Sequence, residues 1–121
     1  MHIFTKMNDI SPYQIVADFM NQYEQIIAPR LKEGKLEDVR FLLYEQTMRS
    51  EDVIKQNLPP MKENGAYANY RMIIQYLGGL AEEKNVTTGL LKSVLISVDR
   101  FSADLDLILS ENPQYKQLRE N

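Results

Sequence analysis

The feature that most restricts the fold of this chain is a row of apolar side chains near its C-terminal end, spaced alternately three and four residues apart. The row consists of Leu91, Val94, Val98, Phe101, Leu105 and Ile108. This spacing places all of them on one face of an α-helix, whereas a half-buried strand would alternate at every second residue. The row predicts a helix that is capped by Thr87 or Thr88 and ends at Asn112, because Pro113 follows. Such a stripe packs against other helices at the shallow angle of a bundle.

Another helix is predicted to begin at Ser11, a serine suited to the N-cap position, with Pro12 in the first turn. Its core-facing residues are predicted to be Val16, Met20, Tyr23 and Ile27, widened by Ile15, Phe19 and Ile26. Pro29 cannot donate to the helical hydrogen-bond ladder, so this helix should kink or stop near Ala28. Gly34 is suited to the C′ position of the turn that follows.

The next helix should start between residues 35 and 37, and it carries two apolar rows. One row is Leu36, Val39 and Leu43, and the other is Phe41, Tyr44 and Met48. The pattern weakens afterwards, and Ser50 followed by Glu51 and Asp52 is typical of a new N-cap. The sequence therefore leaves open whether this stretch is one helix or two that meet at Ser50.

The longest predicted connection is the segment from Leu58 to Gly65, because paired prolines and an Asn-Gly pair cannot continue a helix. The helix after it has a seam formed by Ala66, Tyr70, Ile73, Leu77 and Leu80, broadened by Ile74 and Ala81. Gly78 and Gly79 lie within this seam and allow three interpretations. They end the helix, they let a neighbouring helix approach closely, or they form a surface that receives a partner or ligand.

Together these segments predict an all-α fold: an antiparallel bundle of about four amphipathic helices in a single domain over residues 1–121. Residues 1–10 are predicted to be flexible or extended. Residues 113–121 are predicted to form a short C-terminal helical tail, capped by Asn112. Phe101 is assigned to the core in this scheme, so Phe101→Ala is expected to cost roughly 3–5 kcal/mol.

The composition argues against most enzyme and metal chemistry. The chain has no cysteine, and its only histidine is His2. Asp99, Asp104 and Asp106 are predicted to spread over a solvated helix face rather than to converge as an acid–base pair. The sequence therefore predicts a non-enzymatic protein, with no catalytic, metal-ligating or cofactor-binding residues.

The net charge of −3 and the absence of a concentrated basic segment argue against nucleic acid as the partner. No apolar run reaches the roughly 18 residues needed to cross a membrane. The N-terminal residues also lack the pattern of a secretion signal. These features predict a cytoplasmic protein without a membrane partner.

What remains is a role in binding another protein, as an adaptor, inhibitor, antitoxin or immunity-type factor. Seven tyrosines are present, and Tyr67 and Tyr76 should lie off the helical seam, where aromatic residues serve as interface anchors. Leu58 and Met61 flank the paired prolines of the long connection. These four residues are the predicted interaction surface, with bundle-edge packing and capping of the bundle end as the structural alternatives.

The predicted partner is a protein with a basic surface, since acidic and basic surfaces attract each other, or a second copy of this chain. The alternative function is a homo-oligomeric, nucleic-acid-associated regulator that uses Arg30, Lys32, Lys35 and Arg40.

Overall fold

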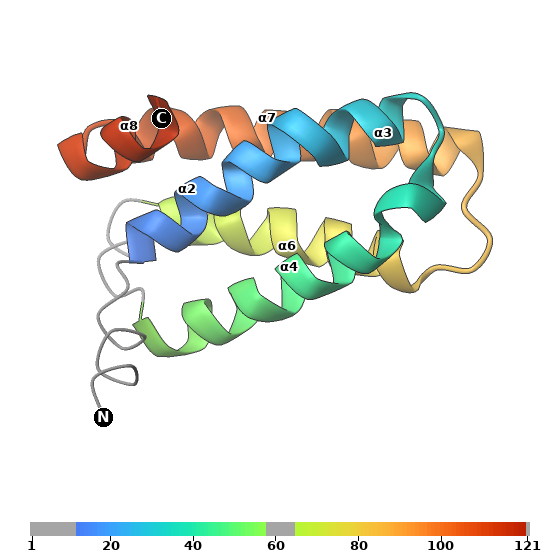
Figure 1. The fold of residues 1–121 in the computed structure, drawn as a ribbon, viewed down its shortest axis with the longest axis horizontal. Coiled ribbons are helices and arrows are strands. Elements are labelled where there is room, and N and C mark those ends of the chain that lie inside the picture. The colour runs from blue at the N-terminus through green and yellow to red at the C-terminus, as the bar shows by residue number, and fades with distance from the viewer. Residues whose placement is uncertain (1–11, 58–64, 121) are drawn as a thin grey trace.

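The computed structural model describes residues 12–57 and 65–120, and all regular structure in these two ranges is helical (Figure 1). The elements in chain order are α2 (Pro12–Gln22), the π-helix η1 (Tyr23–Ile27), α3 (Ala28–Lys32), α4 (Leu36–Asn57), α6 (Ala66–Glu82), α7 (Thr88–Leu109) and α8 (Pro113–Glu120). The all-α prediction is confirmed for these ranges. No helix within them is both long and apolar enough to cross a bilayer. The predictions for Ser11, for residues 1–10, and for Leu58 and Met61 fall outside the described residues.

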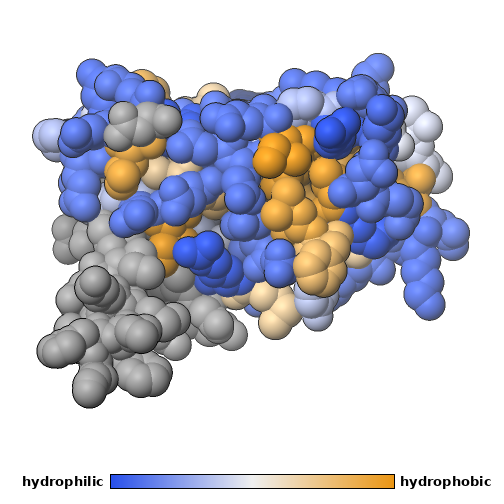
Figure 2. All heavy atoms as spheres, in the orientation of Figure 1, coloured by the Kyte–Doolittle hydropathy of each residue, from blue (hydrophilic) through white to orange (hydrophobic). Residues whose placement is uncertain are grey.

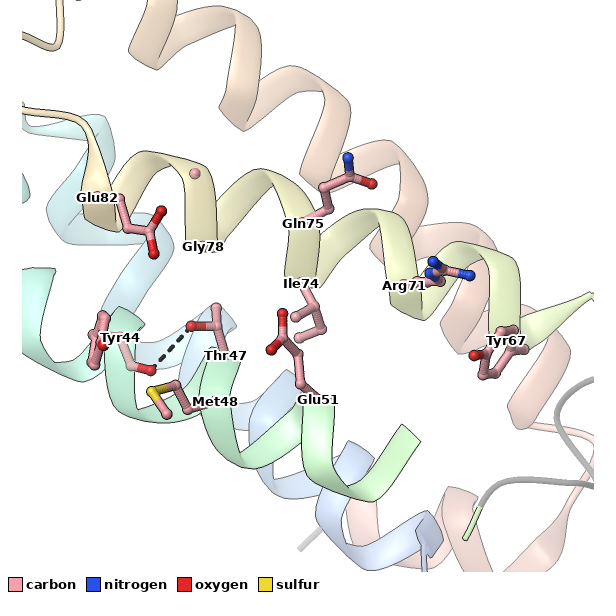
Figure 3. Close-up of a pocket in the computed structure, with 11 residues that line it drawn as sticks. Tyr44, Thr47, Met48, Glu51, Tyr67, Arg71, Ile74, Gln75, Gly78 and Glu82 are labelled. Carbon is pink, nitrogen blue, oxygen red and sulfur yellow. Dashed lines mark hydrogen bonds between the residues drawn. The ribbon is translucent and has the colours of Figure 1, made fainter. Parts of the chain in front are cut away.

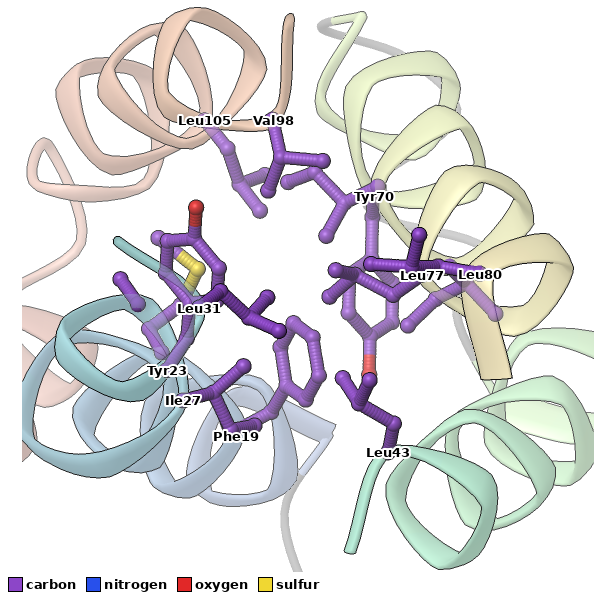
Figure 4. Packing of buried hydrophobic residues seen from close by; sticks show 14 of the residues in the cluster. Phe19, Tyr23, Ile27, Leu31, Leu43, Tyr70, Leu77, Leu80, Val98 and Leu105 are labelled. Carbon is purple, nitrogen blue, oxygen red and sulfur yellow. The ribbon is translucent and has the colours of Figure 1, made fainter. Parts of the chain in front are cut away.

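The helices surround one apolar core. Helix α6 packs against both α4 and α7, while the stretch from α2 to α3 packs against α4, with α3 reaching α7 and α2 supporting α8. Figure 4 shows side chains from each of these directions meeting in the centre. The labelled members of the core are Phe19, Tyr23, Ile27, Leu31, Leu43, Tyr70, Leu77, Leu80, Val98 and Leu105.

The first helical stretch does not stop at Pro29, which corrects one of the two predicted outcomes. Its helical path widens into the π-turn of η1, where the backbone N–H of Ala28 donates to the carbonyl of Tyr23. Pro29 then lies in the first turn of α3, where its missing N–H is tolerated. The stretch ends at Gly34, which has a φ of 76° and confirms the predicted C′ glycine.

The π-turn also explains an error in the predicted core. Ile26 was assigned to the buried face, but its side chain is 42% exposed. Residues in a π-turn rotate less per position than in an α-turn. Ile26 is therefore displaced from the face that buries Tyr23 and Ile27.

Helix α4 is continuous through Ser50, so of the two alternatives that the sequence leaves open, the single helix is the one observed. The physical reason is that Ser50 is buried, with 1% of its surface exposed, and faces the core rather than a helix end. The structure separates the two apolar rows of α4. Leu36, Val39 and Leu43 are buried, whereas Phe41, Tyr44 and Met48 are exposed.

Helix α6 likewise continues past Gly78 and Gly79, so these residues do not end it. Gly78 lies opposite α4: a β-carbon there would be 3.8 Å from the side chain of Thr47, an ordinary contact distance. Gly79 has no such neighbour within 4 Å. Alanine would therefore also fit at both positions, so the close passage of α4 and α6 does not require glycine there.

Arg40 ties the start of α4 to the end of α6. Its Nη1 donates to the carbonyl oxygens of Ala81 at 2.8 Å and Glu83 at 2.7 Å, which have no helical partner at a C-terminus. Glu37 accepts from the Nε and Nη2 of Arg40. The hydrogen bond from Arg40 holds the pKa of Glu37 below its usual value.

Helix α7 begins as predicted, because the Thr87 hydroxyl accepts a hydrogen bond from the Leu90 N–H at 3.1 Å. It ends at Leu109 rather than Asn112. Phe101 is only half-buried, which corrects its assignment to the interior, and its ring stacks on Tyr76 with centroids 5.9 Å apart. Truncation of Phe101 should therefore cost less than full burial would imply.

Helix α8 is capped by Asn112, whose side chain accepts from the backbone N–H groups of Gln114 and Tyr115 at 2.9 and 3.2 Å. This confirms the predicted tail helix. The helix also corrects the prediction for Asp106, which accepts from the Tyr115 hydroxyl at 2.5 Å and from Arg119 at 2.9 Å. Burial opposes ionisation, but these hydrogen bonds outweigh it and lower the pKa of Asp106.

Asp99 is also not a freely solvated carboxylate, because it accepts from the Tyr23 hydroxyl at 2.7 Å. Burial, and then this hydrogen bond, raise the pKa of Tyr23. Of the three predicted surface aspartates, only Asp104 is described as exposed and outside these hydrogen bonds. Two of the acids of α7 therefore hold neighbouring elements in place.

Candidate functional site

A groove with a volume of about 670 Å³ runs between α4 and α6 (Figure 3). It is lined by Tyr44, Thr47, Met48, Glu51, Tyr67, Arg71, Ile74, Gln75, Gly78, Gly79 and Glu82. We refer to these residues as the α4–α6 groove. Two other hollows among the described residues have volumes of about 600 and 360 Å³.

The floor of the groove is formed where the two helices approach each other. Gly78 leaves space beside Thr47, and Ile74 is buried beneath them. The Thr47 hydroxyl donates to the carbonyl of Tyr44 at 3.0 Å, a bond within its own helix (Figure 3). Because this hydroxyl is satisfied locally, the floor needs no water or ligand to complete its hydrogen bonding.

The wall contributed by α4 is apolar and solvent-accessible. Tyr44 is 47% exposed and Met48 is 53% exposed, and Phe41, one turn earlier on the same face, is 74% exposed. Tyrosine anchors interfaces with little loss of side-chain entropy, and the flexible methionine adapts to different partner shapes. Tyr67 supplies a half-buried aromatic residue from α6.

Charged side chains lie along the groove. Figure 3 shows Glu82 near Tyr44 at one end, Glu51 beside Ile74, and Arg71 near Tyr67 at the other end. Two carboxylates therefore accompany one guanidinium. An apolar wall with a polar rim is the usual composition of a protein-binding surface.

The two predicted interaction residues that the structure describes lie on different sides of α6. Tyr67 lines the groove, but Tyr76 is nine positions later, about half a helical turn away in rotation, and stacks on Phe101 of α7 instead. Leu58 and Met61 lie outside the described residues.

Sequence reasoning missed Tyr44 and Met48 as site residues. The signal was present, because α4 carries two apolar rows while one side of a helix is enough to cover a core. The choice between the rows was also indicated by residue type. Leucine and valine fill the buried row, whereas the exposed row consists of phenylalanine, tyrosine and methionine, which are enriched at interfaces.

Exposed apolar residues on η1 and α4 include Ile26, Phe41, Tyr44 and Met48. Figure 2 shows hydrophobic residues gathered in a patch on the viewed face, within a surface that is otherwise mostly hydrophilic. Within the described ranges, no three His, Cys, Asp or Glu side chains are placed to hold a metal ion. The groove offers contacts suited to recognition: aromatic rings, a thioether and complementary charges.

Comparison with known proteins provides no further assignment: no protein-family model, no curated protein and no solved structure matches this chain.

Proposed function

We propose that this protein acts without catalysis, by binding another protein through the α4–α6 groove. We interpret its four long helical stretches as an antiparallel bundle with α8 as the tail, so that the bundle serves as a rigid scaffold for the groove. Interaction by occlusion or bridging, as in an adaptor or inhibitor, needs only such a surface.

The observation that carries the proposal is the exposed row of α4. Phe41, Tyr44 and Met48 contribute to no buried face of the fold, because Leu36, Val39 and Leu43 already supply the core-facing row. Single exposed apolar residues are normal, but a row at helical spacing beside a groove favours an intermolecular contact. Burying such side chains releases about 25 cal/mol per Å² of apolar surface.

We assign an amphipathic helix of a partner protein as the occupant. A helix lying in a groove between two helices presents apolar side chains at spacings of three and four, which matches the spacing of the exposed row. Its polar edge should carry lysine or arginine, because Glu51 and Glu82 border the groove and the whole chain has a net charge of −3.

Synthetic peptides test this assignment. Three fluorescein-labelled helical peptides of about 18 residues, each close to five turns long, would be compared by fluorescence anisotropy. The first carries a Leu/Ile stripe flanked by lysines, the second carries the same stripe flanked by glutamates, and the third is a scrambled version of the first. We expect the lysine-flanked peptide to bind at least about tenfold more tightly than either control, a difference of ~1.4 kcal/mol.

A matched pair of variants locates the binding site. Met48→Glu places a charge on the groove wall, whereas Leu107→Glu places the same charge at a 75% exposed position on α7. We expect Met48→Glu to weaken peptide binding about tenfold or more and Leu107→Glu to leave it unchanged. Equal effects of the two variants would contradict the assignment.

A second copy of the chain is the competing occupant. Light scattering of the protein alone over a hundredfold concentration range should give a monomeric mass. A dimer that Met48→Glu abolishes and Leu107→Glu preserves would show that the groove serves self-association, and it would overturn the assignment of a different protein.

A further inference from the structure

A second hollow, with a volume of about 360 Å³, lies between η1, α3 and α7, on helices other than those of the α4–α6 groove. It is lined by Tyr23, Glu24, Ala28, Pro29, Lys32, Asp99, Ser102, Ala103 and Asp106. Ala28 and Ala103 leave space between the helices because their side chains are small. The π-turn of η1 forms one side, and such turns often occur at functional sites.

Helix α7 presents three oxygen-bearing side chains to this hollow. Asp99, Ser102 and Asp106 follow one another at spacings of three and four residues, so they lie on one face of the helix. All three supply hydrogen-bond acceptors, and the two aspartates supply negative charge. A stripe of this kind suits a ligand that donates several hydrogen bonds and carries positive charge.

Ser102 is the member of the stripe whose hydrogen bonding is incomplete. Its side chain is buried, with 7% of the residue exposed, and its Oγ makes no hydrogen bond to any of the described residues. Leaving a buried hydroxyl without a partner costs roughly 1–3 kcal/mol. A ligand that donates to Ser102 Oγ would recover this cost on binding.

The charges around the hollow are also not balanced. Glu24, Asp99 and Asp106 supply three negative charges, while the nearby cations are Lys32 and Arg119. Arg119 is shared between Glu24 and Asp106.

Asp99 is the carboxylate with the weakest cationic partner, while its Oδ1 also accepts from the Tyr23 hydroxyl at 2.7 Å. Its contact with Lys32 is long, at 3.8 Å. The Asp99 side chain is 45% exposed and the Lys32 side chain is 61% exposed. An ion pair this open to solvent contributes little stability. Asp99 is therefore free to accept a stronger cationic donor in place of Lys32.

From these observations we propose that the hollow binds a primary ammonium or guanidinium group, with Asp99 as its counter-ion and Ser102 Oγ as a hydrogen-bond acceptor. An organic cation fits better than a metal ion, because no three acidic side chains of the described ranges converge on one point. Lys32 is displaced into solvent when the ligand enters. The proposal does not depend on the function of the α4–α6 groove.

The test is a ¹H–¹⁵N NMR titration of the full chain with n-butylammonium and with n-butylguanidinium. We expect saturable shifts confined to the amides of 23–32 and 99–106. n-Butanol and tetramethylammonium are the controls, since the first lacks charge and the second cannot donate a hydrogen bond. Binding of either control as tight as that of butylammonium would overturn the proposal.

Variants assign the contacts. Ser102→Ala should weaken butylammonium binding about three- to tenfold, the loss expected for one hydrogen bond of about 1 kcal/mol. Asp99→Asn, which keeps an acceptor for Tyr23 but removes the charge, should abolish saturable binding. Asp104→Asn, on the exposed face of the same helix, is the matched control and should have no effect. Unchanged binding in both Ser102→Ala and Asp99→Asn would refute the site.

Two further measurements test Lys32 as the internal competitor and identify the kind of molecule that carries the bound ammonium or guanidinium group. Lys32→Met should increase the affinity, because it removes the internal cation; failure of both ligands to bind this variant would refute the site. Spermidine binding more tightly than N-acetyl-lysine amide and N-acetyl-arginine amide would identify a free polyamine. The opposite order would identify a side chain of a partner protein.

Discussion

Helices α4 and α7 are both 22 residues long, but they use their apolar residues differently. Helix α7 buries most of its regular apolar row, with Phe101 and Ile108 half-buried. Its exposed apolar residues Leu90, Ile96 and Leu107 are widely separated along the helix. Helix α4 buries one row and exposes a second one at helical spacing, beside a groove. The comparison shows that periodicity identifies a helical face, while the packing of neighbouring helices decides whether that face is interior or available for binding.

The largest expected effect on stability comes from truncating a buried residue of α7 rather than an exposed residue of α4. Leu105→Ala removes a fully buried side chain from α7 and should lower the free energy of unfolding by about 2–5 kcal/mol. Phe41→Ala removes a larger side chain from α4, but this residue is 74% exposed, so the change should be within ~0.5 kcal/mol. Urea denaturation followed by circular dichroism measures both. Comparable losses would show that the exposed row belongs to the core.

The stability of the protein at alkaline pH tests the burial of residues between α4 and α6. Ser50 of α4 and Tyr70 of α6 are both buried. Burial raises the pKa of Tyr70 from 10.0 to about 12. The unfolded chain therefore releases this proton first, so stability is complete below about pH 10 and declines as the pH rises towards 12. The linked loss reaches about 2 kcal/mol at pH 12.

Tyr70→Phe should reduce this decline, and near neutral pH it should be neutral or stabilising because the buried Tyr70 hydroxyl makes no hydrogen bond of normal geometry among the described residues. Tyr44→Phe, on the exposed row, is the matched control. Free energies of unfolding measured at about pH 9, 10 and 11 give the slope of stability against pH for each variant. A slope for Tyr70→Phe equal to that of the unmodified protein would contradict the assigned burial.

The smallest expected effect concerns the floor of the groove. Gly78→Ala and Gly79→Ala should each raise the free energy of unfolding by about 0.5–1 kcal/mol, because alanine is a better helix former than glycine. A β-carbon at position 78 meets Thr47 only at 3.8 Å, and one at position 79 meets nothing within 4 Å. Thermal denaturation compares the two. Destabilisation by Gly78→Ala alone would mean that α4 lies closer to α6 than described.

Local signals made much of the fold predictable. The cap at Thr87, the cap at Asn112 and the C′ glycine at Gly34 depend on residues within one turn, and all three were anticipated from sequence. Helix continuity was harder. The π-turn before Pro29 and the buried Ser50 each keep a helix intact across a breaking signal, because neighbouring elements supply packing that one-dimensional patterns do not contain.

The candidate site was less predictable because it depends on how two helices are rotated about their axes. Tyr67 and Tyr76 are both predicted as interaction residues, but only Tyr67 lines the groove, whereas Tyr76 stacks on Phe101 of α7. The contacts of Asp106 required knowledge of where α8 returns along the fold, and Arg119 gave no sequence signal of its role. Residues far apart in the chain meet only after the helices have packed.

The most direct test of the exposed α4 row as a docking surface is an NMR measurement on protein labelled with ¹³C at the methionine methyl groups. Met48 lies on the groove wall, whereas Met20 is fully buried in the core and reports any general change in structure. On addition of the lysine-flanked amphipathic peptide, the Met48 methyl signal should shift in a saturable manner while that of Met20 stays in place. A peptide that binds without moving the Met48 signal would contradict the account.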